Sequence, residues 1–264
     1  MGHLYGHELR TEWDGSFELI LSPHRAPGNW LQTGPGAERF SIRQFFGNWE
    51  QARTMVARIE RVGADGPPPP LTPERMAKAL NEAAEYLIAE TTFWANWFDA
   101  YRDTPNEFVG RRGQNRGGAP GKSQLNCFWR VQPDEALLFE MVPPKALWWS
   151  LELNNYWMNS LDYRYHLSSL NFAQAVPEDG GLVRVAIAHE DPGMANWLKT
   201  GGHCEGRVEL RWILAESAPV PKTRLVKLAD LPFVVPATAR RITPDERREQ
   251  LRRRKIGVDR RFRV

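Results

Sequence analysis

The chain has 264 residues and a formal net charge of +3, with 42% hydrophobic and 25% charged residues, the composition of a soluble globular protein. No apolar run approaches the roughly 18 residues that a membrane-spanning helix needs. The N-terminus has no apolar signal-peptide segment, and the two cysteines are too few for a disulfide scaffold or a thiolate-rich metal cage. These features predict a cytoplasmic protein that does not span a membrane.

Residues 1–66 alternate apolar and polar side chains with a period of two. The alternation is clearest over residues 17–21, 40–44 and 55–60. A period of two is typical of a strand that buries one face. We therefore expect residues 1–66 to form a first, partial β unit.

Residues 67–122 interrupt this pattern. The prolines of 67–70 predict a stiff polyproline linker, and Thr72 before Pro73 is a good N-cap for a helix. Apolar side chains then follow helical spacing to about residue 101. Residues 103–122 are rich in Gly and Arg and show no periodicity. The segment therefore predicts a linker, a long helix and a loop between two β regions.

Residues 123–238 return to strand-like alternation and predict a second β-sandwich unit. Turn residues such as Pro133-Asp134 separate the alternating stretches. The expected strands are residues 125–132, 135–142, 146–153, 168–176, 182–189 and 207–215.

Residues 239–264 form a basic C-terminal tail. From residue 240 onward there are eleven Arg and Lys against four Asp and Glu. Thr243 and Glu246 make a capping box around Pro244, which predicts a helix over residues 244–255. Nucleic-acid binding is disfavoured because no aromatic side chain lies among the arginines before Phe262. We expect a solvated helix that packs on the body.

One sequence pattern occurs twice. His-x-x-Pro-Gly followed by Asn-Trp-Leu begins at His24 and again at His189, 165 residues later. The separation becomes 167 from Asn onward, because the second copy has two extra residues. The repeat predicts a mainly β fold, with two related antiparallel β-sandwich-like units joined by the long α-helix and followed by a short basic helix. Its favoured role is structural, with Asn bonding backbone and Trp filling the end of the sandwich. The alternative places His24 and His189 at one cleft between the units.

The second copy and its surroundings resemble a known bacterial family. The similar stretches are Ser160-Leu161-Asp162-Tyr163, Ser168-Ser169-Leu170-Asn171, Ala188-His189-Glu190-Asp191-Pro192-Gly193, Asn196-Trp197-Leu198 and Arg211-Trp212. Together they are similar to the family called domain of unknown function 1214 (DUF1214). The resemblance implies a β-sandwich, often with a related β domain upstream, and no established activity. Longer members have N-terminal residues that this chain lacks, and Lys199 stands where the pattern has Asp.

Two other motifs are weaker. Residues 117–123 suggest a phosphate-binding loop, but Arg116 occupies the position that requires Gly, and a strand is predicted to follow. His203 and Cys204 lack a second ligand pair at zinc spacing, and the six histidines show no i, i+4 pairing. The sequence therefore predicts no metal site, and it indicates no particular cofactor.

The candidate site is the aromatic stretch that begins at Trp148. On a strand, Trp148, Glu152 and Asn154 share the face opposite the core. Apolar walls with a few polar groups are typical of small-molecule pockets, and a carboxylate beside Trp can act as an acid near neutral pH. The predicted catalytic residues are Glu152 and His166, and the predicted ligand-binding residues are Trp148, Asn154, Tyr156, Trp157, Arg164 and His189. Alternatively, Trp148 covers the sheet under the long helix and Glu152 pairs with an arginine.

Three functions follow from these residues. The favoured one is binding of a small apolar or amphipathic molecule of steroid, terpenoid or aromatic type in a Trp-lined pocket, with binding and transformation both open. The second is a carbohydrate-binding sandwich with Trp148, Tyr156 and Trp157 as an exposed platform. The third is a non-catalytic assembly domain, such as a homo-oligomer, that uses the long helix and the arginine-rich tail.

Overall fold

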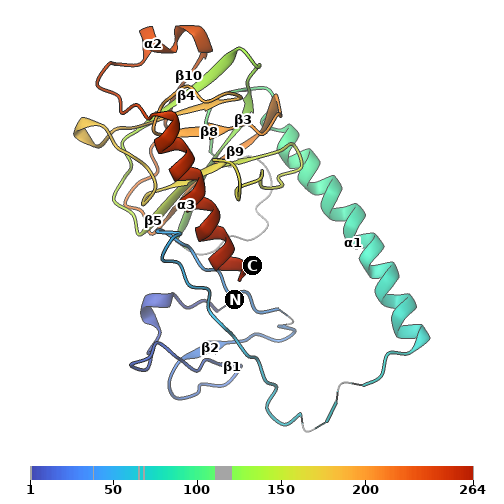
Figure 1. Ribbon diagram of the computed structural model, residues 1–264. Coiled ribbons are helices and arrows are strands. Elements are labelled where there is room, and N and C mark those ends of the chain that lie inside the picture. The colour runs from blue at the N-terminus through green and yellow to red at the C-terminus, as the bar shows by residue number, and fades with distance from the viewer. Residues whose placement is uncertain (1, 38, 65, 68, 111–120, 264) are drawn as a thin grey trace. The chain divides into compact units, whose positions relative to one another are not determined.

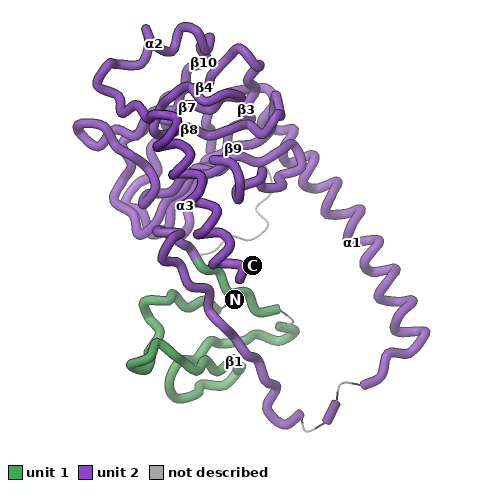
Figure 2. Tube along the Cα trace, viewed as in Figure 1, with its two compact units in different colours: residues 1–44 green, residues 45–264 purple. Residues whose placement is uncertain are grey.

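The computed structural model describes residues 2–37, 39–64, 66–67, 69–110 and 121–263. The chain forms two compact units, residues 1–44 and residues 45–264 (Figures 1 and 2). The fold is mainly β, with three sheets, one long helix and a C-terminal helix, as predicted. No helix in the described part of the chain is both long and apolar enough to cross a membrane.

The first unit contains a short 3-10 helix, η1 (Gly6–Glu8), and two short strands, β1 (Ile20–Ser22) and β2 (Trp30–Gln32). The two strands pair in parallel, whereas antiparallel pairing was expected. The reason is the loop 23–29, in which Gly28 has a φ of 76°. This loop returns the chain to the start of β1, so that β2 runs in the same direction.

The strands predicted over residues 40–44 and 55–60 do not form. Their alternating apolar side chains face solvent, as shown by Ile42, which is 49% exposed, and Val56, which is 77% exposed. Alternation gives a strand one face to bury, but it supplies no neighbouring strand for the backbone hydrogen bonds. Without a partner the same pattern remains irregular.

The second unit is built on two four-stranded sheets with the orders β10-β4-β7-β8 and β3-β9-β5-β6. All pairings within them are antiparallel except that of β7 with β8. The strands are β3 (Lys122–Arg130), β4 (Glu135–Met141), β5 (Trp148–Asn154), β6 (Ser169–Asn171), β7 (Val183–Ala188), β8 (Trp197–Lys199), β9 (Glu205–Ile213) and β10 (Lys222–Lys227). Six of them lie where the sequence predicts strands. β8 and β10 were missed. β8 has three residues, too few to show alternation, and β10 is an exposed, largely polar edge strand that lacks the alternation typical of a buried face.

The main core lies between these two sheets. One face of each sheet contributes apolar side chains. They include the fully buried Trp129 and Trp212 on the β3-β9-β5-β6 sheet, and Phe139 and Ile187 on the β10-β4-β7-β8 sheet. A second cluster covers the other face of the β4-β7 sheet beneath α2 (Leu231–Val234) and includes Trp197. This arrangement leaves the outer face of the β3-β9-β5-β6 sheet for polar residues.

Two helices flank the sheets of the second unit (Figure 1). α1 (Pro73–Asp99) starts at Thr72, whose side chain accepts a hydrogen bond from the Arg75 backbone at 3.3 Å. Its C-terminal turns bury Trp97 and Phe98 against Phe128 of β3. α3 (Pro244–Phe262) starts with the predicted capping box and continues seven residues beyond the predicted end. The helix continues through Gly257, because this glycine is buried against the backbone of Trp49.

The two copies of the repeated pattern make corresponding backbone contacts. In each copy the Asn side chain donates hydrogen bonds to the backbone carbonyls of two residues. It also accepts a hydrogen bond from the backbone N–H of one of those two residues. The Trp indole donates to a backbone carbonyl of the preceding strand. The donations join Asn29 to Arg10 and Glu18, Trp30 to Ser22, Asn196 to Val176 and Arg184, and Trp197 to Ala188, at 2.8–3.2 Å. These side chains therefore tie the local backbone together.

The two cysteines lie in opposite environments. Cys127 is buried in the core, where desolvation raises the pKa of its thiol far above the ordinary value, and Cys204 is exposed. Because the thiolate is the reactive form, a thiol reagent should label one cysteine in the native protein and two in denaturant. Mass spectrometry after brief labelling checks the count, with Cys204→Ser as the control that should remain unlabelled when native. Rapid labelling of both cysteines in the native protein would contradict the predicted burial.

Candidate functional site

The predicted site residues do not share one pocket. Trp148 lies under Phe45, at 5.0 Å between ring centroids, and its indole donates to the Phe46 carbonyl at 3.2 Å. It is therefore covered by residues 45–46 and not by α1. Tyr156 lies at the end of α1, where its hydroxyl bonds Asp99 at 2.9 Å, and Trp157 beside it is 61% exposed. Burial and the Asp99 hydrogen bond raise the pKa of Tyr156.

The remaining predicted residues are also dispersed. Arg164 forms an ion pair with Asp259 of α3 at 2.7 Å, and the His189 ring lies 3.1 Å from the Val131 carbonyl. His166 lines a small polar hollow of about 300 Å³ together with Asp162, Lys199 and His203. The predicted site residues of 148–166 therefore lie in several separate environments and not in one pocket. The reason is that the chain turns after β5, so that successive side chains point in different directions.

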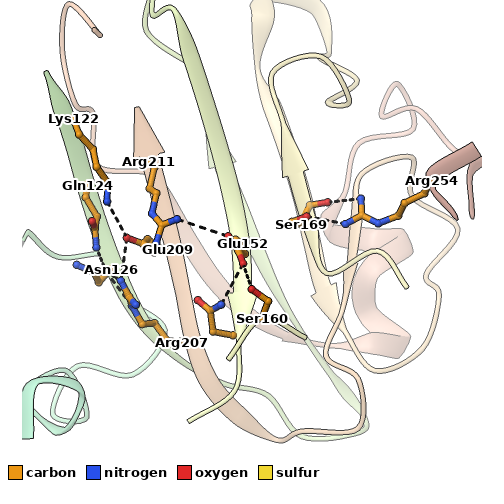
Figure 3. A network of polar contacts seen from close by, with 11 residues as sticks. Lys122, Gln124, Asn126, Glu152, Ser160, Ser169, Arg207, Glu209, Arg211 and Arg254 are labelled. Carbon is orange, nitrogen blue, oxygen red and sulfur yellow. Dashed lines mark hydrogen bonds and ion pairs between the residues drawn. The ribbon is translucent and has the colours of Figure 1, made fainter. Parts of the chain in front are cut away.

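Glu152 and Asn154 are the two predicted residues that the structure brings into one polar network (Figure 3). Glu152 accepts hydrogen bonds from Ser160 at 2.6 Å and from Asn154 at 3.4 Å. One of its oxygens lies 3.9 Å from a guanidinium nitrogen of Arg211. The arginine pairing considered as the alternative for Glu152 is therefore present.

The network continues across the outer face of the β3-β9-β5-β6 sheet (Figure 3). Its centre is Glu209 of β9, which is 1% exposed and stands directly opposite Glu152 in the strand register. Glu209 pairs with Arg211 and with Arg207, the latter at 3.1 Å, and Lys122 lies at 3.8 Å. Two opposed carboxylates repel each other, so the neighbouring cations stabilise this arrangement.

The sequence analysis missed the β9 residues of this network. Their signal was present, because Arg207, Glu209 and Arg211 occupy alternate positions of a predicted strand. Charges at every second position mark a strand face that is polar and needs counter-ions. Arg207 also lies over the Trp97 ring of α1 at 4.7 Å, which links the network to the helix.

A larger hollow, of about 560 Å³, lies beside α3. We call it the α3 hollow. Its apolar walls include Trp49, Leu167 and Trp197, and its polar lining includes Ser169 and Arg254. Residues 48–50 form one side and α3 another, while Ser169 belongs to β6 and Trp197 to β8. The hollow therefore combines four segments that are distant in the sequence.

Trp49 is held between two arginines of α3. The guanidinium carbons of Arg254 and Arg261 lie 4.4 and 4.6 Å from its ring centroids, a cation–π arrangement. Gly257 lies between them on the same helix face, and a Cβ added there would come within 2.9 Å of the Trp49 carbonyl oxygen. The glycine thus permits close approach of the Trp49 backbone, which explains why the helix continues through it.

Arg254 of α3 is a buried cation that contacts Ser169 of β6, beside the polar network on the outer face of the sheet (Figure 3). It is 5% exposed and donates to the Tyr163 carbonyl, the Ser169 carbonyl and the Ser169 hydroxyl at 2.7, 3.1 and 2.7 Å. Burial, together with the charge of Arg261, lowers the pKa of Arg254 to about 9. None of the ion pairs formed by the described residues includes Arg254.

Glu50, Asp245, Glu246 and Glu249 also line the α3 hollow, and the three on α3 each have a cationic partner. Glu249 pairs with Arg252 and Arg253 at 2.6 and 2.8 Å, and these contacts lower its pKa to about 2. Glu246 pairs with Arg240 at 2.9 Å, and Asp245 pairs with Arg248. In the part of the chain that the structure describes, no group of three or more His, Cys, Asp and Glu side chains is placed to hold a metal ion. Residues 111–120, which include part of the suggested phosphate loop, lie outside the described residues.

Residues 136–216 match the model of a family described as protein of unknown function (DUF1214). Over these residues the chain is similar to the DUF1214 family. The resemblance carried by the sequence motifs is thereby confirmed. The DUF1214 region contains β5 to β9, and with them Glu152, Glu209, Ser169 and Trp197. α3 and residues 48–50, which complete the α3 hollow, lie outside the matched region.

Solved structures that are similar to this chain include two bacterial proteins. An uncharacterised protein from Burkholderia cenocepacia is 34% identical with a TM-score of 0.78, over 87% of this chain and 65% of that protein. This chain therefore spans about two thirds of the length of that relative. A protein from Vibrio parahaemolyticus is 15% identical with a TM-score of 0.35, over 61% of this chain and 47% of its own. No curated protein matches the chain.

Proposed function

We propose that this protein binds a small amphipathic organic molecule in the α3 hollow. The observation that carries the proposal is a hollow of about 560 Å³ that combines apolar wall residues, among them Trp49 and Trp197, with polar and charged side chains. Ligand sites commonly have volumes of about 300–1,000 Å³ and combine apolar walls with polar groups that orient the ligand. The proposal keeps the ligand class predicted from the sequence and moves the pocket from residues 148–166 to α3.

Two observations favour this proposal over the alternatives. A carbohydrate platform needs exposed aromatic rings side by side, whereas Trp148 is covered by Phe45 and the Tyr156 hydroxyl is bonded to Asp99. An assembly role for the basic tail needs free arginines, whereas Arg247 and Arg254 of α3 are buried against the body of the unit. The exposed Arg248, Arg252 and Arg253 pair with carboxylates of the same helix. The cytoplasmic location and the homo-oligomer remain predictions from the sequence.

The proposal is tested by titrating the protein with 2-naphthol, a neutral two-ring amphipathic probe, in a calorimeter. We expect saturable binding at one site. Ala173 lines the hollow and is exposed, so Ala173→Trp should fill the space without disturbing the core and weaken binding by about tenfold or more, equivalent to about 1.4 kcal/mol.

The matched control is Ala79→Trp, an equally exposed alanine on α1 away from the hollow, which should bind like the unchanged protein. The proposal fails if 2-naphthol and its acidic and amide analogues all leave the protein unbound. It also fails if Ala173→Trp binds the probe as tightly as the control.

A further inference from the structure

We infer that the ligand of the α3 hollow is a small carboxylic acid whose carboxylate is bound by Arg254. This inference rests on the proposed function, since it names the chemical class of the molecule that the hollow takes. It is carried by the placement of a buried cation without an ion-pair partner among the described residues at the wall of a hollow that also contains Trp49 and Trp197.

The guanidinium of Arg254 retains hydrogen-bonding capacity. An arginine carries five N–H donors, and the described contacts of Arg254 use one donor on each of its three nitrogens. One N–H therefore remains on each of the two terminal nitrogens. Because both terminal nitrogens donate to the same residue, Ser169, their facing N–H pair is already used, and each remaining N–H can donate one charge-assisted hydrogen bond to a carboxylate oxygen.

The charge of Arg254 is also incompletely balanced. Its hydrogen-bond acceptors are two backbone carbonyls and one hydroxyl, all of them neutral. Arg261 lies on the same helix and stacks on the same Trp49 ring, which adds a second positive charge. A buried charge is costly unless it is paired, so a bound anion would stabilise this end of the hollow.

The carboxylates in the lining do not fill that role. Glu249, Glu246 and Asp245 each pair with another arginine of the C-terminal region, and Arg254 is not among their partners. Glu50 also lines the hollow, but it is exposed to solvent, which screens its charge. A ligand carboxylate would therefore meet a cation at Arg254, and the paired or solvent-exposed acidic groups would not oppose it strongly.

The rest of the ligand is constrained by the walls. Trp49 and Trp197 provide aromatic surface, and Leu167 adds aliphatic surface next to Ser169 and Arg254. A planar or ring-containing apolar body fits such walls, because flat rings bury their faces against indole edges and aliphatic side chains. The ligand class is thus a small acid with an apolar, ring-containing body.

The test compares 2-naphthoate with 2-naphthamide, which has the same rings and nearly the same shape but no charge. Calorimetric titration of the full chain at neutral pH should show that 2-naphthoate binds at least about tenfold more tightly. Arg254→Met should remove this preference. Arg254→Lys keeps the positive charge but has three N–H donors in place of five, and it should retain part of the preference.

Arg252→Met is the matched control, because Arg252 lies on the same helix, pairs with Glu249 and is outside the lining of the hollow. It should keep the full preference for the acid. The thermal midpoint of each variant shows whether it is folded. If Arg254→Met does not fold, the inference is tested by Arg254→Lys and by comparing the binding of the two probes to the unchanged protein.

The outcomes separate the two proposals. If 2-naphthol binds but 2-naphthoate and 2-naphthamide bind equally, the inference about Arg254 is overturned and the proposed function stands. If the acid is preferred and folded Arg254→Met keeps that preference, the role of Arg254 is overturned. If none of the three probes binds, both proposals fall together.

Discussion

Glu209→Gln is expected to lower the free energy of unfolding by about 3–5 kcal/mol, the range measured when one partner of a buried ion pair is removed. Glu209 is 1% exposed and pairs with Arg207 and Arg211, with Lys122 close by. Glutamine keeps the size of the side chain but removes the negative charge. A neutral amide attracts these cations less strongly than the carboxylate does, so the free-energy cost of burying them is offset less.

The measurement is urea unfolding of the full chain, followed by tryptophan fluorescence. Glu152→Gln is the matched control, because Glu152 faces Glu209 in the register but has a side chain 27% exposed and an Arg211 contact of 3.9 Å. That variant should cost no more than about 1 kcal/mol. Equal effects of the two substitutions would show that Glu209 is not the electrostatic centre of the network.

Gly206→Ala is expected to destabilise the second unit by about 3 kcal/mol, at the upper end of the usual cost of overpacking a core. Gly206 lies in β9, and a Cβ added there would come within 2.3 Å of the Asn154 carbonyl oxygen and 2.8 Å of the Trp129 ring. Trp129 is fully buried, and the carbonyl belongs to the neighbouring strand β5. Neither can move away without disturbing the sheet or the core.

The same urea titration tests this substitution. Gly110→Ala is its control, because a Cβ at Gly110 meets no atom within 4 Å, so the change should stay within about 0.5 kcal/mol. A Gly206→Ala protein as stable as the control would mean that β9 and β5 can separate locally at low cost. The comparison therefore measures how rigidly the outer polar face is held.

The sequence was most informative where local rules are strong. The capping residues Thr72 and Thr243 mark the starts of α1 and α3 correctly, because an N-cap acts within one turn. Six strands of the second unit follow from alternation, since a strand in a two-layer fold has one face in the core. The DUF1214 resemblance follows from short motifs that stay recognisable wherever they lie.

The same rules failed where a partner was needed. Residues 40–44 and 55–60 alternate but remain irregular, and the exposed edge strand β10 forms without alternation because β4 offers it a partner. Gly257 is a plausible helix end by local preference, yet α3 continues, because the Trp49 backbone packs against that glycine. Pairing and packing over long sequence separations override the local preference in each case.

The sequence by itself determined the mainly β class, the two principal helices and the family of residues 136–216. It also placed Glu152 and Asn154 together on the face opposite the core. Tertiary structure alone decided which charges surround Glu209 and where a hollow forms. The α3 hollow joins Trp49, Ser169, Trp197 and Arg254, which lie on four separate segments. A local sequence pattern cannot predict that these residues come together, because their proximity results from the packing of α3 and residues 48–50 against the sheets.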